Sequence, residues 1–249
     1  EAVRRELASQ PNQETENSEK TSQMRMGLVN EIIPIADSRL GELKEYWKEG
    51  MHGAKMAVFG DASESMQCAI EASTIFATMV SVCFDAELSF FSYKLVQSPH
   101  EKPRSVGETL EVCDTIRASG CTSLAAALWP YFEKKKSMDV FVLVTDEHEN
   151  EKCNGFHFAD LFAEYKGCVN KNVSLVLVCV GKGDASFRQS LADNGITYKA
   201  VYIDESRPDL AKFDALLGQL ALVSSRCSLS PEPAKVNEHN SGEDEFVIV

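Results

Sequence analysis

The chain has 249 residues, of which 44% are hydrophobic and 25% charged, and its formal net charge is −13 at pH 7. This composition is typical of a soluble folded domain, and its acidity argues against a module that binds nucleic acid by itself, because phosphate backbones repel such a surface. No apolar run is long enough to span a bilayer and no signal peptide opens the chain, so no membrane association is expected.

The two ends of the chain differ from its middle. Residues 1–25 are polar and aperiodic, which predicts a flexible lead-in, and residues 225–249 read as a disordered acidic tail. Residues 26–53 are predicted to form a helical linker or packing segment, with a helix over Ser38–Lys48 that Ser38 caps. Because the first residue is Glu1 and not Met, we expect a fragment that lacks an N-terminal domain.

Residues 54–224 alternate between apolar runs of strand length and longer helix-like patterns. Strands are expected near 55–60, 87–92, 139–145, 173–180 and 198–203, with an edge strand at 93–97. Helices are expected near 66–83, 106–117, 123–135, 157–167, 185–194 and 208–222. This alternation predicts a doubly wound α/β domain with a mostly parallel, Rossmann-like sheet and helices on both faces. No G-x-G-x-x-G follows the first strand, which argues against dinucleotide binding.

The eight cysteines form no C-x-x-C pair, and several lie in apolar patterns. They indicate a reducing, intracellular and cytoplasmic setting. A zinc site made of Cys121, His148, Cys153 and His157 is an alternative use for two of them, although this spacing matches no known zinc motif.

A polar loop follows the first strand and presents Asp61, Ser63 and Ser65 as Asp-x-Ser-x-Ser. One carboxylate and two hydroxyls at the carboxyl end of a strand suit Mg²⁺, which prefers hard oxygen ligands and keeps several waters. The alternative is helix capping, because Asp and Ser are common N-cap residues. We expect Asp61 to face solvent at the end of its strand.

Two further polar residues occur downstream at comparable places. Thr122 lies in a small-residue loop between two predicted helices, and Asp146 directly follows the strand at 139–145. If the first and fourth strands are neighbours, Asp61 and Asp146 converge at the switch point of the sheet, and Thr122 can close the site.

This set resembles the metal-ion-dependent adhesion site of von Willebrand factor A (vWA) domains, in which D-x-S-x-S is followed by Thr and then by Asp. The resemblance covers about Lys55–Val223. It implies a Mg²⁺, replaceable by Mn²⁺ or Ca²⁺, whose ligands are Asp61, Ser63, Ser65, Thr122 and Asp146. It also implies one open coordination position, which takes a carboxylate from a partner protein.

Within that family the chain is similar to the C-terminal vWA domain of Ro (TROVE) ribonucleoproteins, and a telomerase-associated relative is equally compatible. The similarity rests on residues 139–146, then Glu149, His157, Ala159 and Tyr165-Lys166, and on Ala72-Ser73-Thr74. In Ro proteins a ring of helical repeats binds RNA, so we expect RNA contact only through a missing N-terminal domain.

The function predicted from the sequence is therefore a non-enzymatic binding module. One alternative is a Mg²⁺-dependent hydrolase or phosphotransferase, for which Glu147, His148 and Glu149 are the candidate bases. A solvated acidic loop is the favoured interpretation of these three residues. The other alternative is a structural domain whose site stays empty. The sequence indicates no oligomeric state.

Overall fold

The computed structural model describes residues 31–46, 53–203, 216–218, 220 and 222. The named elements are, in chain order, β1 (Met56–Asp61), the 3₁₀ helix η1 (Glu64–Cys68), α3 (Ile70–Phe84), β2 (Glu87–Phe91), β3 (Leu95–Gln97), α4 (Val106–Thr115), α5 (Ala125–Glu133), β4 (Val140–Thr145), α6 (Phe158–Cys168), β5 (Ser174–Val180), α7 (Ala185–Asp193) and β6 (Tyr198–Ile203). A further helix covers residues 31–46, and the described residues at 216–222 are also helical.

The strands form one six-stranded sheet in the order β3-β2-β1-β4-β5-β6. All neighbouring pairs are parallel except β2 and β3, which pair antiparallel and leave the short β3 at the edge. The chain winds outward in one direction from β1 and in the other from β4, so the order reverses between these two strands. The predicted doubly wound, mostly parallel α/β fold is confirmed.

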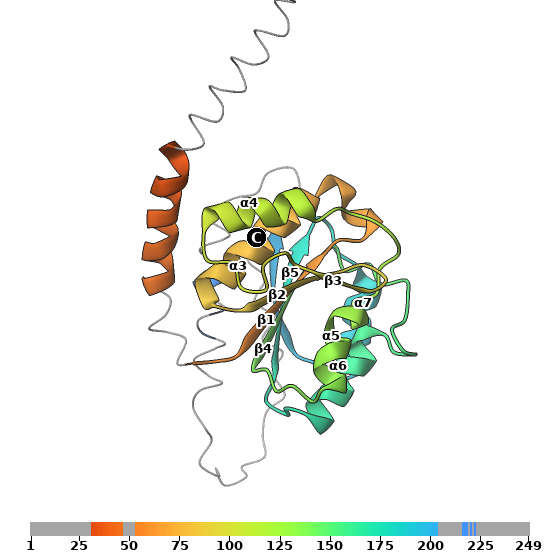
Figure 1. Cartoon of the computed structure of the whole chain (residues 1–249). Coiled ribbons are helices and arrows are strands. Elements are labelled where there is room, and N and C mark those ends of the chain that lie inside the picture. Colours follow the sequence, from red (N-terminus) through yellow and green to blue (C-terminus); the bar gives the residue numbers. More distant parts are fainter. Residues whose placement is uncertain (1–30, 47–52, 204–215, 219, 221, 223–249) are drawn as a thin grey trace, which may run out of the picture.

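The central strands are buried on both faces, as their nearly continuous apolar sequences require. In β1, Met56 and Val58 belong to one core cluster, whereas Ala57 and Phe59 belong to the other. The first cluster lies under α3, α4 and the helix at 31–46, and the second lies under α5, α6 and α7 (Figure 1). The two layers of helices hold the carboxyl ends of β1 and β4 side by side.

Two helices differ from their predicted extents. The helix expected near 66–83 begins at Ile70, and the residues before it form the 3₁₀ helix η1. Ser38, predicted to cap a helix, lies inside the helix that covers 31–46. The helix therefore covers residues before the predicted start, and Pro34 lies within its described part.

Some predictions fall outside the described part of the chain. These are the lead-in at 1–25, the tail at 225–249 and most of the helix at 208–222, of which residues 216–218, 220 and 222 are helical. Among the helices that the structure describes, none is both long and apolar enough to cross a membrane.

Candidate metal centre

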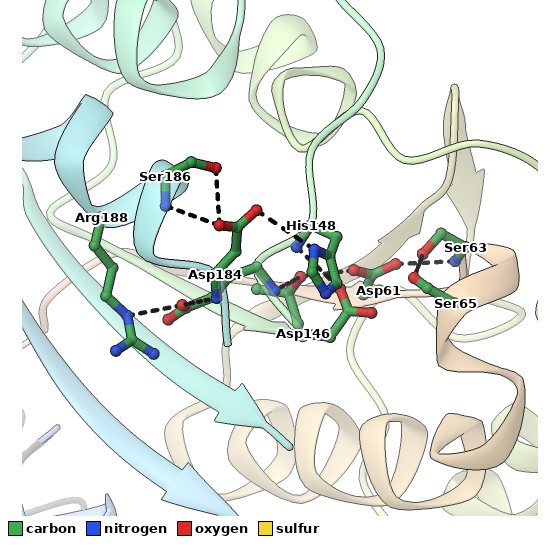
Figure 2. A network of polar contacts seen from close by, with 10 residues as sticks. Asp61, Ser63, Ser65, Asp146, His148, Asp184, Ser186 and Arg188 are labelled. Carbon is green, nitrogen blue, oxygen red and sulfur yellow. Dashed lines mark hydrogen bonds and ion pairs between the residues drawn. The ribbon is translucent and has the colours of Figure 1, made fainter. Parts of the chain in front are cut away.

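The carboxyl ends of β1 and β4 are adjacent because the two strands pair in parallel register, with Gly60 opposite Val144. Asp61 ends β1, and Asp146 comes directly after the last residue of β4. These residues lie where the strand order reverses, which is where open α/β sheets form a crevice. Figure 2 shows Asp61, Ser63 and Ser65 at one end of a polar network, with Asp146 beside them.

Asp61 is completely buried, contrary to the expectation that it faces solvent. Its Oδ1 accepts a hydrogen bond from the Ser63 amide at 2.9 Å, and its Oδ2 accepts one from Thr145 Oγ1 at 2.6 Å. Burial raises the pKa of Asp61 to about 6; the hydrogen bonds oppose this change, and the charge of Asp146 adds to it. Asp61 therefore has a strong preference for a nearby positive charge.

The two serine hydroxyls lie side by side and are hydrogen-bonded to each other, with Ser63 Oγ and Ser65 Oγ 3.0 Å apart. Ser63 occupies the N-cap position of η1, but its side chain makes no capping hydrogen bond. The capping alternative therefore does not account for this hydroxyl. Ser63 is buried and Ser65 is exposed, so the pair reaches from the interior of the site to its surface.

Thr122 lies in a loop that is hydrogen-bonded to the loops on either side. The Ser119 amide donates to the Ala62 carbonyl and the Glu64 amide donates to the Gly120 carbonyl, which ties this loop to the Asp61 loop. Gly120 has a φ of +77°, and a Cβ there would lie 2.7 Å from the Tyr93 ring, so the turn requires glycine.

The other side of this loop is tied to the segment that follows β4. The Thr122 amide donates to Asn150 Oδ1 at 2.9 Å, and the Thr122 carbonyl accepts from the amides of Asn150 and Glu151. Thr122 is 2% exposed. The structure therefore brings Asp61, Ser63, Ser65 and Asp146 together and places the backbone of Thr122 between the loops that carry them.

The donor set fits a small divalent cation. In octahedral Mg²⁺ coordination with bonds of about 2.1 Å, neighbouring ligand oxygens are about 3.0 Å apart, which is the separation of the Ser63 and Ser65 hydroxyls. Within the described residues, neither Asp61 nor Asp146 forms an ion pair. Two neighbouring carboxylates without a counter-charge are therefore compensated if a cation binds between these oxygens.

The acidic loop after β4 is not the solvated loop that its sequence suggested. Glu147 is fully buried, and the side chain of Glu149 is 7% exposed. Glu149 accepts hydrogen bonds from the amides of Phe158 and Ala125, at the start of α6 and α5. His148 is the exposed member of the three, and its Nδ1 lies 3.4 Å from Asp184 Oδ2. The carboxylate partners of Glu147 are at least 32 residues away in sequence, so no local pattern could reveal its burial.

The alternative zinc set is not assembled. No group of three or more His, Cys, Asp or Glu side chains in the described part of the chain is arranged to hold a metal, and this part includes Cys121, His148, Cys153 and His157. The adhesion-type set is of a different kind, because three of its five members are hydroxyl residues.

No sequence-family model and no curated protein sequence matches the chain. Among solved structures it is similar to a von Willebrand factor type A protein from Catenulispora acidiphila, at 15% identity and a TM-score of 0.48 over 69% of this chain and 42% of that one. It is also similar to the Ro (RSR) protein of Deinococcus radiodurans, at 14% identity and a TM-score of 0.40 over 58% and 34%.

A third similar structure is a D319A mutant of the PilB minor pilin from Streptococcus sanguinis, at 9% identity and a TM-score of 0.42 over 72% of this chain and 64% of that one. The chain therefore spans less than two thirds of each of these proteins. At such identities and TM-scores, the strand order and connections described above carry the assignment of fold. The mostly parallel six-stranded sheet with helices on both faces is a doubly wound α/β fold.

Proposed function

We propose that this chain is a non-enzymatic binding module of the vWA type, which uses a divalent cation to bind a carboxylate of a partner protein. The Ser63 and Ser65 hydroxyls would hold Mg²⁺ together with Asp61, Thr122 and Asp146, directly or through water. When bound, the cation supplies an electropositive coordination position that accepts an acidic group.

The observation that carries the proposal is the pair of serine hydroxyls 3.0 Å apart beside the buried Asp61, which has no ion-pair partner among the described residues. If the serine hydroxyls bind the cation directly and the carboxylates act through water, the cation keeps part of its positive charge and attracts an acidic ligand. Weak metal affinity in the absence of that ligand follows from the same property.

The hydrolase alternative is less favoured by the geometry. A general base must be free to take a proton from the reacting group. Glu147 is engaged by Cys179, Asp184 and Arg188, and Glu149 is engaged by two backbone amides. Only His148 among the three candidates is exposed. The proposal therefore excludes metal-dependent turnover of phosphoester and nucleotide substrates.

A narrower form of the proposal places this module in a Ro-like ribonucleoprotein. It rests on the sequence likeness at residues 139–146 and at Ala72-Ser73-Thr74 in α3. In that setting the vWA-type module would engage a protein, and RNA would be held by another part of the assembly, because a charge of −13 opposes RNA binding here.

Calorimetric titration with Mn²⁺ tests the proposal, with Ser65→Ala as the informative variant. Ser65 is exposed, so removal of its hydroxyl should leave the fold intact while Mn²⁺ affinity falls at least tenfold. Ser137→Ala is the matched control, because Ser137 is an exposed serine just before the amino end of β4, and its affinity should equal that of the parent.

Added acetate tests the open position in the same titration. A carboxylate that binds the held cation must tighten metal binding by the factor with which the metal tightens carboxylate binding. Acetate should therefore raise the Mn²⁺ affinity of the parent, once the binding of acetate to free Mn²⁺ is corrected for. A parent chain that binds no Mn²⁺ would leave the structural-domain alternative, and a Ser65→Ala variant that binds it equally well would overturn the proposed metal site.

A further inference from the structure

Glu147, the residue after Asp146, has its carboxylate fully buried between β4, β5 and α7. Its Oε1 accepts a hydrogen bond from Cys179 Sγ at 2.7 Å. Its Oε2 accepts from the Asp184 amide at 2.9 Å and from Arg188 Nε at 2.8 Å. One side chain thus fastens the loop of the candidate metal centre to β5 and to the start of α7.

The backbone of Glu147 shows why such fastening is needed. Its φ is +67°, in the left-handed region that residues other than glycine rarely adopt. A residue persists in that conformation when surrounding contacts over-determine it. Here the three contacts of the carboxylate supply that restraint, and all three partners come from residues at least 32 positions away in sequence.

Two residues close to Glu147 in the loop, Thr145 and His148, are hydrogen-bonded to the carboxylates of the candidate site. The Glu147 amide donates to Thr145 Oγ1 at 3.0 Å, and Thr145 Oγ1 donates in turn to Asp61 Oδ2 at 2.6 Å. The His148 amide donates to Asp146 Oδ1 at 3.1 Å. The backbone conformation at Glu147 therefore orients hydrogen bonds to both Asp61 and Asp146.

The β5–α7 segment is shaped around this contact. Gly183 has a φ of +68°, and a Cβ there would collide with both the Arg188 guanidinium and the Glu147 carboxylate. Arg188 also lies over the Tyr202 ring, 4.9 Å from its centroid, and its Nη2 is buried without a hydrogen-bond partner in the described structure. Figure 2 shows Arg188 and Asp184 leading into the network that reaches Asp146.

We infer that Glu147, held by Arg188, is a positioning residue that sets the carboxylates of Asp61 and Asp146 for cation binding. This inference rests on the proposed metal function. It predicts that the metal affinity of the site depends on the ion pair between Glu147 and Arg188, although neither side chain contacts a proposed metal ligand.

The test compares Mn²⁺ affinity in the full chain with the double variant Glu147→Ala/Arg188→Met. The double change removes the anchor without leaving an unpaired buried charge, which limits the loss of stability. We expect Mn²⁺ affinity to fall about tenfold, by analogy with the loss of groups that orient metal ligands. Glu147→Gln keeps an acceptor for the Asp184 amide and should retain affinity within about threefold of the parent.

The matched control is Glu87→Ala/Lys136→Met. This pair also joins a carboxylate to a cation, 2.6 Å apart, and its carboxylate is partly buried. Glu87, however, begins β2, at the opposite end of the sheet from the candidate site. The control should lower the unfolding temperature and leave Mn²⁺ affinity unchanged. The Glu147 double variant should lower both the unfolding temperature and the Mn²⁺ affinity. The contrast with the control distinguishes positioning from a general loss of stability.

Amide hydrogen exchange gives a second readout that needs no metal. The amides of Glu147 and His148 should exchange faster in the Glu147 double variant, whereas in the Glu87 control they should exchange as in the parent. Equal Mn²⁺ affinity in parent and double variant, or unchanged exchange at these amides, overturns the inference. Failure of the parent itself to bind Mn²⁺ overturns instead the proposed function, and the exchange result then decides the anchoring role alone.

Discussion

At the scale of single residues, two fully buried carboxylates near this site are compensated differently. Glu147 has the guanidinium of Arg188 beside it, whereas Asp61 is hydrogen-bonded to Ser63 and Thr145 and has no ion-pair partner among the described residues. Burial accordingly raises the pKa of Asp61 to about 6. A carboxylate left in this condition is typical of a functional position that is not optimised for stability.

Asp61→Asn tests this interpretation. Because the folded-state pKa of Asp61 exceeds its ordinary value of 3.8, ionisation above that value opposes folding. We expect the metal-free variant to gain about 1–3 kcal/mol at pH 7 while it loses Mn²⁺ binding. Thermal unfolding in EDTA measures the first effect. If Asn instead lowers stability, Asp61 serves mainly as a structural acceptor.

At the scale of elements, Glu149 joins the starts of two helices. Its carboxylate accepts from the Phe158 amide at the first residue of α6 and from the Ala125 amide at the first residue of α5. Burial nevertheless raises its pKa to about 7, and these hydrogen bonds only partly oppose that effect. The folded chain therefore holds a proton on Glu149 up to a higher pH than the unfolded chain does.

The pH dependence of stability follows from this pKa. Between 4.5 and about 7 the folded chain holds a proton on Glu149 that the unfolded chain has released, so stability rises as pH falls through this window. Glu149→Gln should remove that part of the rise and reduce the slope of unfolding free energy against pH. Urea unfolding of metal-free parent and variant at several pH values measures the difference, and identical slopes would show that Glu149 titrates normally.

Most helices and strands, but not all of their boundaries, could be predicted from the sequence. The strands and helices from β1 to β6 could be predicted because their apolar periodicities are local. The start of α3 could not, because the Asp61 loop continues into a 3₁₀ turn that helix periodicity does not distinguish. The helix at 31–46 was predicted only from Ser38 onward, so its described residues 31–37 were missed.

The candidate site was predicted in part for the same reason. Residue types, spacing and the resemblance to an adhesion site pointed to five candidate residues, and the pairing of β1 with β4 places two of them, Asp61 and Asp146, near each other. The burial of Glu147 could not be predicted, because its partners Cys179, Asp184 and Arg188 meet it only in the folded chain.

At the scale of the whole molecule, a net charge of −13 sets the condition for partner binding. An acidic surface attracts divalent cations and repels carboxylate ligands, except where a bound cation inverts the local charge. The proposed function puts such a cation at the carboxyl ends of β1 and β4, where the serine hydroxyls lie beside Asp61 and Asp146.

The most direct measurement is a crystal structure of the chain soaked with Mn²⁺, with the metal located by anomalous diffraction. The proposed function predicts one strong peak in contact with both Ser63 Oγ and Ser65 Oγ at about 2.1–2.2 Å, with at least one coordination position filled by water or a carboxylate. The absence of a peak between these hydroxyls at saturating Mn²⁺, or a peak only elsewhere on the acidic surface, would contradict it.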